Sequence, residues 1–315
     1  MSRDEWLEPF LRISDPAVTI TPNADLTNET SMKMRATARA VAKVESPQAL
    51  KKVLLESRTS RVPAFVLGGG KNTLFATSHF EGLVMKLGRG FGGLEMVGAN
   101  TIRAGGSVAL PSLVRYTHSV GMMGLEFLTM VPGTVGGSLA GNAGAGGYGL
   151  CDYVDRVYLM TRDGFIASVG RNEFRHSYRH SELREAVVLV ADFRLERFNP
   201  AEATQRMDSY KEKKKGQPYS LPSSGCIFKN PKIAPDRTIS AGMLIDQCGL
   251  KGYRINSAVV SEEHANFIVN TGSSSGEDFL ALIALVKDRV KAKTGFDLHV
   301  EVQIVGGPLG NTMLQ

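Results

Sequence analysis

Residues 132–149 read PGTVGGSLAGNAGAGGYG, a stretch of eighteen residues with eight glycines, no charge, and Leu139 and Tyr148 as its only large side chains. Glycine has no side chain to bury and loses the most backbone freedom on ordering, so such a run is not expected to fill a core. Its bare N–H groups can instead approach a bulky polar ligand closely, above all a phosphate. A flexible linker is the alternative, but Val135, Leu139 and Asn142 interrupt the run. We therefore predict a ligand cradle.

A second glycine-rich turn, GGGKN at residues 68–72, follows a short apolar strand predicted for residues 64–67. N–H groups that follow a strand can form an anion-binding nest, although a plain tight turn explains the same residues. Together the two segments favour a dinucleotide ligand, which has two phosphates and a long body to contact. GRGFGG at residues 88–93 matches the GxGxxG pattern, but a strand rather than a helix is predicted after it, and we reject a Rossmann site.

The composition is that of an ordinary globular protein, with 43% hydrophobic and 22% charged residues in a chain of 315. This length predicts two or three cores. The net charge of +6 comes partly from the run KEKKK at residues 211–215, and no basic–aromatic interleaving is present. We therefore expect no nucleic-acid partner and favour anionic small substrates, which positive clefts concentrate. Cys151, Cys226 and Cys248 lack metal-ligand spacing, and their odd number argues against a disulfide framework.

The N-terminal residues MSRDEWLEPFLRIS carry three acidic side chains and no apolar region of the secretory type. The most apolar long stretch, residues 121–149, contains Pro132 and ten glycines and is a poor spanning helix. We expect a cytoplasmic protein without membrane insertion.

Helices and strands are interspersed along the chain without regular βαβ alternation, which predicts an α+β fold. Ser46–Pro47 opens one predicted helix, an amphipathic helix is expected over residues 276–294, and a continuous strand over residues 298–305. The charged, poorly periodic helix predicted from Asn199 to near Gly216 is the best candidate for a domain boundary.

Four polar residues stand out, and each also has a purely structural explanation. Cys226 lies among small residues with Lys229 nearby, so an exposed thiol whose thiolate the ammonium favours is one interpretation, but a small buried cysteine is the commoner state for such a residue taken alone. Arg179 can clamp a carboxylate or belong to a basic surface turn. Glu301 fits the half-solvated alternation of its predicted strand, and His264 fits a loop histidine, so spacing alone assigns neither a role.

Seven motifs, taken in order, resemble the UDP-N-acetylenolpyruvoylglucosamine reductase (MurB) family in its shorter type, over roughly residues 35–306. They are GGGKN (68–72), GLEFLTMVPGTVGGSLAGNAGA (124–145), YRHS (178–181), SSGCIFKNP (223–231), AGMLIDQCGLKG (241–252), VSEEHANFIVN (260–270) and LHVEVQIVG (298–306). The resemblance implies a non-covalent FAD that is reduced by NADPH and then gives hydride to UDP-N-acetylglucosamine enolpyruvate. The product would be UDP-N-acetylmuramate, a precursor of peptidoglycan.

The resemblance also implies an FAD-binding fold of two α+β subdomains, similar to the vanillyl-alcohol oxidase (PCMH) type, and a C-terminal α+β substrate-binding domain. The corresponding ranges are 1–90, 91–205 and 206–302, with the tail 303–315 returning to the first. The two glycine-rich segments would hold FAD. The implied contacts are Gly68, Gly69, Gly70, Lys71, Asn72, Pro132, Gly133, Thr134, Gly136, Gly137, Asn142, Ala143 and Gly144.

By the same resemblance, Arg179 stabilises the charge that hydride addition leaves on the substrate, and Glu301 works beside it. Cys226 occupies the position where most members carry a serine that donates the proton. A thiol, with an ordinary pKa of about 8.5, is a stronger acid than a serine hydroxyl, so we expect activity to be retained. An exposed thiol further predicts sensitivity to peroxide. The implied substrate contacts are Tyr178, Lys214, Gln217, Asn230, His264 and Asn266.

Two other interpretations stay open at this point. A flavin oxidoreductase of the same fold could act on an alcohol or hydroxy acid, although SSGCIFKNP and LHVEV belong to the substrate part of the resemblance and argue against it. A non-catalytic nucleotide-binding protein is suggested by the missing serine, although Arg179 and Glu301 are both present. Under the favoured interpretation we expect a monomer that binds a UDP-sugar and NADPH, with no metal.

Overall fold

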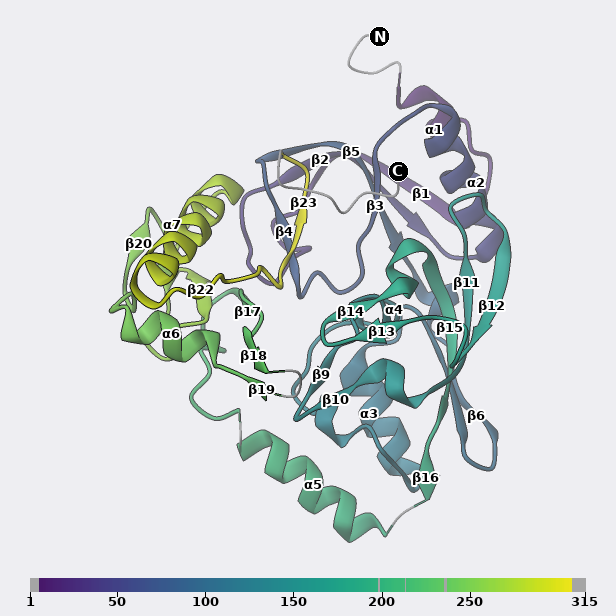
Figure 1. The fold of residues 1–315 in the computed structure, drawn as a ribbon. Helices are drawn as coiled ribbons and strands as arrows, with labels where there is room; N and C mark the ends of the chain where they lie inside the picture. The colour runs from purple at the N-terminus through teal and green to yellow at the C-terminus, as the bar shows by residue number, and fades with distance from the viewer. Residues whose placement is uncertain (1–5, 198, 213, 235–236, 308–315) are drawn as a thin grey trace.

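The computed structural model describes residues 6–197, 199–212, 214–234 and 237–307, which form three main sheets with helices packed on them (Figure 1). The first sheet is mixed, because β2, β5 and β3 run parallel while β1 is antiparallel to β2. Two helices accompany it. In spatial order the strands are β1 (Val18–Asp25), β2 (Thr37–Val44), β5 (His79–Leu87) and β3 (Ala64–Val66), and the helices are α1 (Glu8–Leu11) and α2 (Pro47–Thr59).

Helix α2 forms where its sequence signals predict it. Ser46 caps it by accepting a hydrogen bond from the Ala49 N–H (3.1 Å), and Pro47 stands at the first helical position. Leu50, Val53 and their neighbours on the same face are buried against the first sheet, which supplies most of the stabilisation that a helix of this length needs.

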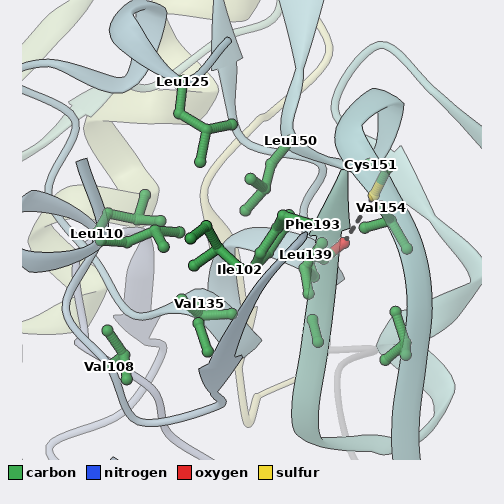
Figure 2. Close-up of a cluster of buried hydrophobic side chains, with 14 of the residues drawn as sticks. Ile102, Val108, Leu110, Leu125, Val135, Leu139, Leu150, Cys151, Val154 and Phe193 are labelled. Carbon is green, nitrogen blue, oxygen red and sulfur yellow. Dashed lines mark hydrogen bonds between the residues drawn. The ribbon is translucent and has the colours of Figure 1, made fainter. Parts of the chain in front are cut away.

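The second sheet is antiparallel throughout and contains the predicted strand of residues 187–195 at its centre. Figure 2 shows the buried cluster beneath it, where Leu110 of α3 and Val135 and Leu139 of α4 meet Ile102 and Phe193. The strands are β12 (Ile166–Gly170), β11 (Val154–Met160), β15 (Val187–Arg194), β7 (Thr101–Gly105) and β6 (Leu94–Gly98), and the helices are α3 (Leu110–Ser119) and α4 (Val135–Ala140).

Short elements fill the connections around these two sheets. Residues 88–93, the GRGFGG motif, contain a short 3-10 helix and lead into strand β6. Because a strand rather than an α-helix follows the motif, the rejection of a Rossmann site agrees with the structure. The remaining elements are η1 (Arg89–Phe91), β8 (Met122–Met123), η2 (Glu126–Leu128), β9 (Gly144–Ala145), β10 (Tyr148–Gly149), η3 (Leu150–Tyr153), β13 (His176–Ser177), β14 (His180–Ser181), η4 (Glu182–Glu185) and β16 (Glu196–Arg197).

The third sheet lies beyond the polar helix α5 (Pro200–Glu212), which crosses from the second sheet along one edge of the molecule (Figure 1). Helix α7 (Gly276–Thr294) packs on this sheet through Phe279, Ile283 and Val286. No helix of the described ranges is long and apolar enough to cross a membrane. The other elements are β17 (Ser223–Cys226), β22 (Phe267–Asn270), β21 (Ala258–Val260) and β20 (Arg254–Ile255), with α6 (Ala241–Gln247) and the pair β18 (Lys232–Ala234) and β19 (Arg237–Thr238).

The strand predicted over residues 298–305 is confirmed at its C-terminal end only. Val300 makes a single bridge to Phe228, beside the third sheet, and only β23 (Gln303–Val305) is a strand, which pairs in parallel with β4 (Thr73–Phe75). Side chains along the segment still alternate between its two sides because the backbone stays extended. The hydrogen-bonding partner of the backbone changes, however, from the Phe228 segment at Val300 to β4 at Gln303–Val305. The segment therefore connects the third sheet to β4, which follows the first glycine-rich turn. The domain boundaries given above stay a prediction.

Gly276, the first residue of α7, offers a test of how tightly the third sheet is joined to β4. A Cβ at Gly276 would lie 1.9 Å from the carbonyl oxygen of Phe75. We expect Gly276→Ala to lower the free energy of unfolding by about 1–3 kcal/mol or more through overpacking, although alanine favours helices. Urea denaturation measures this. Gly93→Ala is the control, since nothing lies within 4 Å of its Cβ position, and an equal effect there would contradict the packing argument.

Candidate functional site

A cavity of about 1240 Å³ is lined by residues of all three main sheets. Its wall is built chiefly from the loop 28–33, the two glycine-rich segments, the connection 214–226 and the crossing segment 300–304. Most of the predicted site residues meet here. Those that line it are Gly68, Gly69, Gly70, Lys71, Asn72, Pro132, Gly133, Thr134, Gly136, Gly137, Ala143, Gly144, Arg179, Lys214, Gln217, Cys226 and Glu301.

The two glycine-rich segments pack directly against each other in the cavity wall. A Cβ at Gly68 would lie 2.8 Å from Thr134 Oγ1, and one at Gly69 would lie 3.2 Å from the facing backbone of the second segment. Gly70 has φ +61, and a Cβ there would lie 1.9 Å from the carbonyl oxygen of Glu29. Side chains are therefore excluded, and bare backbone lines the cavity. Such a wall fits the phosphates and ribityl chain of FAD.

The second glycine-rich segment also contributes to a core, contrary to the expectation from its composition. Thr134 caps α4 by accepting a hydrogen bond from the Gly137 N–H (3.4 Å). Val135 and Leu139, four residues apart, lie on one face of this short helix and are fully buried. Gly137 lines the cavity. Two apolar anchors thus hold one face of the segment while the glycines leave the cavity side free of side chains.

The wall carries a large excess of positive charge. Among its described lining residues, Glu301 is the one carboxylate, against seven cations. Such a site concentrates anions, and two phosphates of a dinucleotide would offset part of this charge. No group of three or more His, Cys, Asp or Glu side chains in the described ranges is arranged to hold a metal ion. The seven cations are Lys33, Lys71, Lys86, Arg179, Arg184, Lys214 and Lys229.

Arg179 reaches the cavity from the tight turn between β13 and β14. Its backbone has φ +55, a left-handed conformation that is uncommon for a residue with a side chain and that recurs at functional sites. Its Nε donates to Glu301 Oε1 (2.5 Å), and its Nη1 donates to the carbonyl oxygen of Gly144 (2.9 Å). The guanidinium is thereby fixed at two points on opposite ends of the planar group.

Glu301 sits where the crossing segment changes partners. Its N–H donates to the Ile227 carbonyl (2.7 Å), and its own carbonyl accepts from Asn72 Nδ2 (3.2 Å) in the first glycine-rich turn. Burial raises the pKa of its carboxyl group, and the positive charges of Arg179 and Lys229 oppose that shift. The half-solvated position predicted from the alternation is wrong, because the side chain is only 13% exposed.

Cys226 ends β17 and is partly buried in the cavity wall. Burial, and then the charge of Glu301, raise the pKa of its thiol to about 11, while Arg179 and a hydrogen bond with Asn266 act in the opposite direction. The structure thus agrees with the interpretation of a buried cysteine rather than with that of an exposed thiolate, and the sensitivity to peroxide stays a prediction. At neutral pH the group is a thiol that still carries its proton.

Two predicted substrate contacts lie on the connection between α5 and β17. Lys214 Nζ donates to the Thr129 carbonyl (3.2 Å), and burial and the nearby Arg179 lower the pKa of its ammonium group to about 8. Gln217 Oε1 accepts a hydrogen bond from the hydroxyl of Tyr219 (2.6 Å). Both side chains line the cavity.

Five other predicted contacts do not line the cavity. Asn230 Oδ1 accepts from the Ala241 N–H (3.0 Å) at the start of α6. The side-chain amide of Asn266 binds both the N–H and the carbonyl of Phe228, at 2.9 Å each, beside β17. The others are Tyr178, whose ring packs on the Arg179 guanidinium, His264, whose ring packs on Phe267, and Asn142, which is buried. Asn142 and Asn266 thus bond to backbone close in sequence to Arg179 and Cys226 respectively.

Several cavity residues were not identified from the sequence. The loop 28–33 reaches the wall because Ser31 binds the backbone of the first glycine-rich turn and Asn270 Nδ2 donates to the carbonyls of Met32 (3.0 Å) and Lys33 (3.2 Å). No local pattern signals such a contact. Arg184 lies three residues after the YRHS motif and Tyr219 four residues before the SSGCIFKNP motif, and this proximity was the available signal.

Comparison with known proteins identifies both halves of this architecture. The family model "FAD binding domain" matches residues 38–170, and the model "UDP-N-acetylenolpyruvoylglucosamine reductase, C-terminal domain" matches residues 217–305. The chain is similar to the UDP-N-acetylenolpyruvoylglucosamine reductase of Bacillus subtilis (strain 168), with 37% identity over 289 residues that cover 90% of this chain and 93% of the relative. The enzyme of the same name from Synechococcus sp. (strain WH7803) is 37% identical over 284 residues, covering 88% and 90%.

A solved structure agrees with these matches. The crystal structure of the MurB reductase from Thermus caldophilus superposes with a TM-score of 0.77 at 32% identity, covering 91% of this chain and 98% of that one. The α+β fold with an FAD-binding part and a C-terminal part is thereby confirmed, as is the resemblance seen in the motifs. This chain belongs to the UDP-N-acetylenolpyruvoylglucosamine reductase (MurB) family of FAD-dependent oxidoreductases.

Proposed function

We propose that this protein reduces UDP-N-acetylglucosamine enolpyruvate to UDP-N-acetylmuramate in peptidoglycan precursor synthesis, with FAD as bound cofactor and NADPH as electron donor. The observation that carries the proposal is the convergence of Arg179, Glu301 and the protonated thiol of Cys226 on one cationic cavity whose remaining wall is bare glycine backbone. Membership of the family supports it.

The two glycine-rich segments would hold FAD, with backbone N–H groups facing its phosphates and Lys71 adding a positive charge. When bound, the flavin supplies a hydride to the methylene carbon of the enolpyruvyl group. The protein supplies the two remaining requirements, which are stabilisation of the negative charge that develops on the substrate and a proton donor.

Arg179 stabilises the negative charge that hydride addition leaves on the adjacent carbon and its carboxylate. The bonds to Glu301 (2.5 Å) and to the Gly144 carbonyl (2.9 Å) fix the guanidinium before the substrate arrives, so no reorganisation is needed as the charge develops. Glu301 thus orients Arg179 and balances its positive charge. Lys229 adds a further positive charge, so that the group of Arg179, Glu301 and Lys229 is net positive. Lys229 Nζ donates to the Arg179 carbonyl (3.4 Å).

Cys226 gives its proton to the carbon next to the carboxylate. The double bond of the enolpyruvyl group is thereby replaced by two new C–H bonds, one from the hydride and one from the thiol proton, and the thiolate that remains recovers a proton from water. Because the pKa of this thiol is about 11, it is protonated at the start of each turnover, which a donor requires.

The overall reaction is tested in two anaerobic steps. We expect the purified protein to be yellow, to be bleached by NADPH, and to recover its flavin absorbance on addition of the enolpyruvyl sugar nucleotide. Stopped-flow absorbance measures both steps. Recovery with oxygen but not with the sugar nucleotide would indicate a flavin oxidoreductase with another substrate, and a colourless protein that binds no FAD would indicate a non-catalytic nucleotide-binding protein.

The donor role is tested by replacing the thiol. We expect Cys226→Ala to leave bleaching by NADPH unchanged and to slow reoxidation by the sugar nucleotide roughly 10²- to 10⁴-fold, since one general acid is lost. Cys226→Ser restores a donor and should recover most of the rate. Cys248→Ala, at a cysteine that does not line the cavity, is the matched control. Unchanged reoxidation in Cys226→Ala would refute the role.

The lowered pKa of Lys214 predicts a pH dependence of substrate binding. Its ammonium group loses its proton as the pH rises through about 8, so the KM for the anionic sugar nucleotide should rise above that pH. In Lys214→Arg this alkaline limb should disappear, because a guanidinium stays charged beyond pH 12. Steady-state KM values between pH 6.5 and 9.5 measure the effect, and the same limb in both proteins would assign it to another group.

A further inference from the structure

Asn142 lies in the second glycine-rich segment, yet its side chain does not line the cavity. It is 6% exposed, and both ends of its amide are bonded to backbone. Oδ1 accepts from the Cys151 N–H (3.0 Å), and Nδ2 donates to the Ser177 carbonyl (2.9 Å). Its backbone has φ +44, a conformation that asparagine, aspartate and glycine tolerate best. Of these three, asparagine alone supplies both a donor and an acceptor.

The partners of Asn142 lead directly to the catalytic arginine. Ser177 is the last residue of β13 and precedes the Tyr178–Arg179 turn. Gly144, two residues after Asn142, carries the carbonyl that receives Arg179 Nη1 at 2.9 Å. Residues 142–144 therefore contact the arginine region at two points. Asn142 bonds to Ser177, which precedes the turn, and the Gly144 carbonyl bonds to the guanidinium of Arg179.

Gly149 shows that the surrounding backbone is shaped around this amide. Its φ of −121 and ψ of 151 are extended angles that any residue adopts. A Cβ at Gly149 would nevertheless lie 2.4 Å from Asn142 Oδ1, and the three nearest atoms to that Cβ all belong to the Asn142 amide. Glycine is required at residue 149 because it leaves room for Asn142, rather than because a ligand approaches there.

We propose that Asn142 is a positioning residue that aims the Arg179 guanidinium at Glu301 and at the reacting carbon, by clamping Ser177 to the second glycine-rich segment. This assignment replaces the cofactor contact predicted from the sequence. Its kinetic consequence rests on the proposed function, while its structural consequence, the geometry of the Arg179–Glu301 pair, does not.

The kinetic test uses Asn142→Gly, which keeps the left-handed backbone and removes both bonds, and Asn142→Asp, which removes the donor to Ser177. We expect FAD content and bleaching by NADPH to change less than twofold, and reoxidation by the sugar nucleotide to slow roughly 10- to 100-fold, as a misplaced catalytic group does. Asn23→Gly is the matched control, since Asn23 is an exposed asparagine with φ +46, and its rates should stay those of the wild type.

A double-mutant cycle separates positioning from general damage. In an Arg179→Ala background, Asn142→Gly should slow single-turnover reoxidation less than twofold further, because no guanidinium is left to aim. A full additional loss of 10-fold or more in that background would overturn the proposal. Gly149→Ala should slow reoxidation by itself, and combined with Asn142→Gly it should be no slower than Asn142→Gly alone, because the methyl group then has room.

A readout independent of substrate distinguishes failure of this inference from failure of the proposed function. In protein labelled with ¹⁵N-arginine, the Nε–H of Arg179, assigned by its loss in Arg179→Lys, should exchange slowly with water because it is bonded to Glu301. We expect at least 10-fold faster exchange in Asn142→Gly and wild-type exchange in Asn23→Gly. Unchanged exchange in Asn142→Gly would overturn the positioning role, even if the sugar nucleotide proves not to be the substrate.

Discussion

The ion pair between Arg179 and Glu301 is the interaction on which the site depends, because it brings together three distant parts of the chain. Arg179 comes from a turn beside the second sheet, and its guanidinium also binds the second glycine-rich segment at Gly144. Glu301 is bonded through its backbone both to Ile227, beside β17, and to Asn72 in the first glycine-rich turn. Partial burial costs both charges hydration, so the pair is favourable only because the surrounding backbone holds it in good geometry.

That backbone is held in place by packing and hydrogen bonds. Gly68 and Gly69 press against the second segment, Val135 and Leu139 anchor α4 in the core, and Asn142 fixes the approach to Arg179. The left-handed angles of Asn142 and Arg179 persist because neighbouring contacts determine them more strongly than local preference does. Glycine therefore serves two purposes in residues 132–149. At Gly137 the absence of a side chain leaves backbone facing the cavity, and at Gly149 it leaves room for the side-chain amide of Asn142.

Burial sets the chemistry of the two titratable groups that flank this pair. It raises the pKa of the Cys226 thiol to about 11 and lowers that of the Lys214 ammonium to about 8, since in each case it disfavours the charged form. The thiol is thereby kept protonated at neutral pH, as the proposed proton donor requires.

The sequence by itself determined several of the helices and strands and the family to which the chain belongs. Local signals were sufficient for α2, with its Ser46 cap and Pro47, and for α7, and the motifs around Arg179, Cys226 and Glu301 indicated the family. Only the tertiary structure decided that residues 298–305 change partners at Glu301, that the Asn142 amide bonds to the backbone of Cys151 and Ser177, and that burial raises the pKa of the Cys226 thiol. The reason is physical. Capping and periodicity act between residues a few positions apart, whereas burial, pairing partners and pKa values depend on neighbours more than a hundred residues away, such as Glu301 for Arg179.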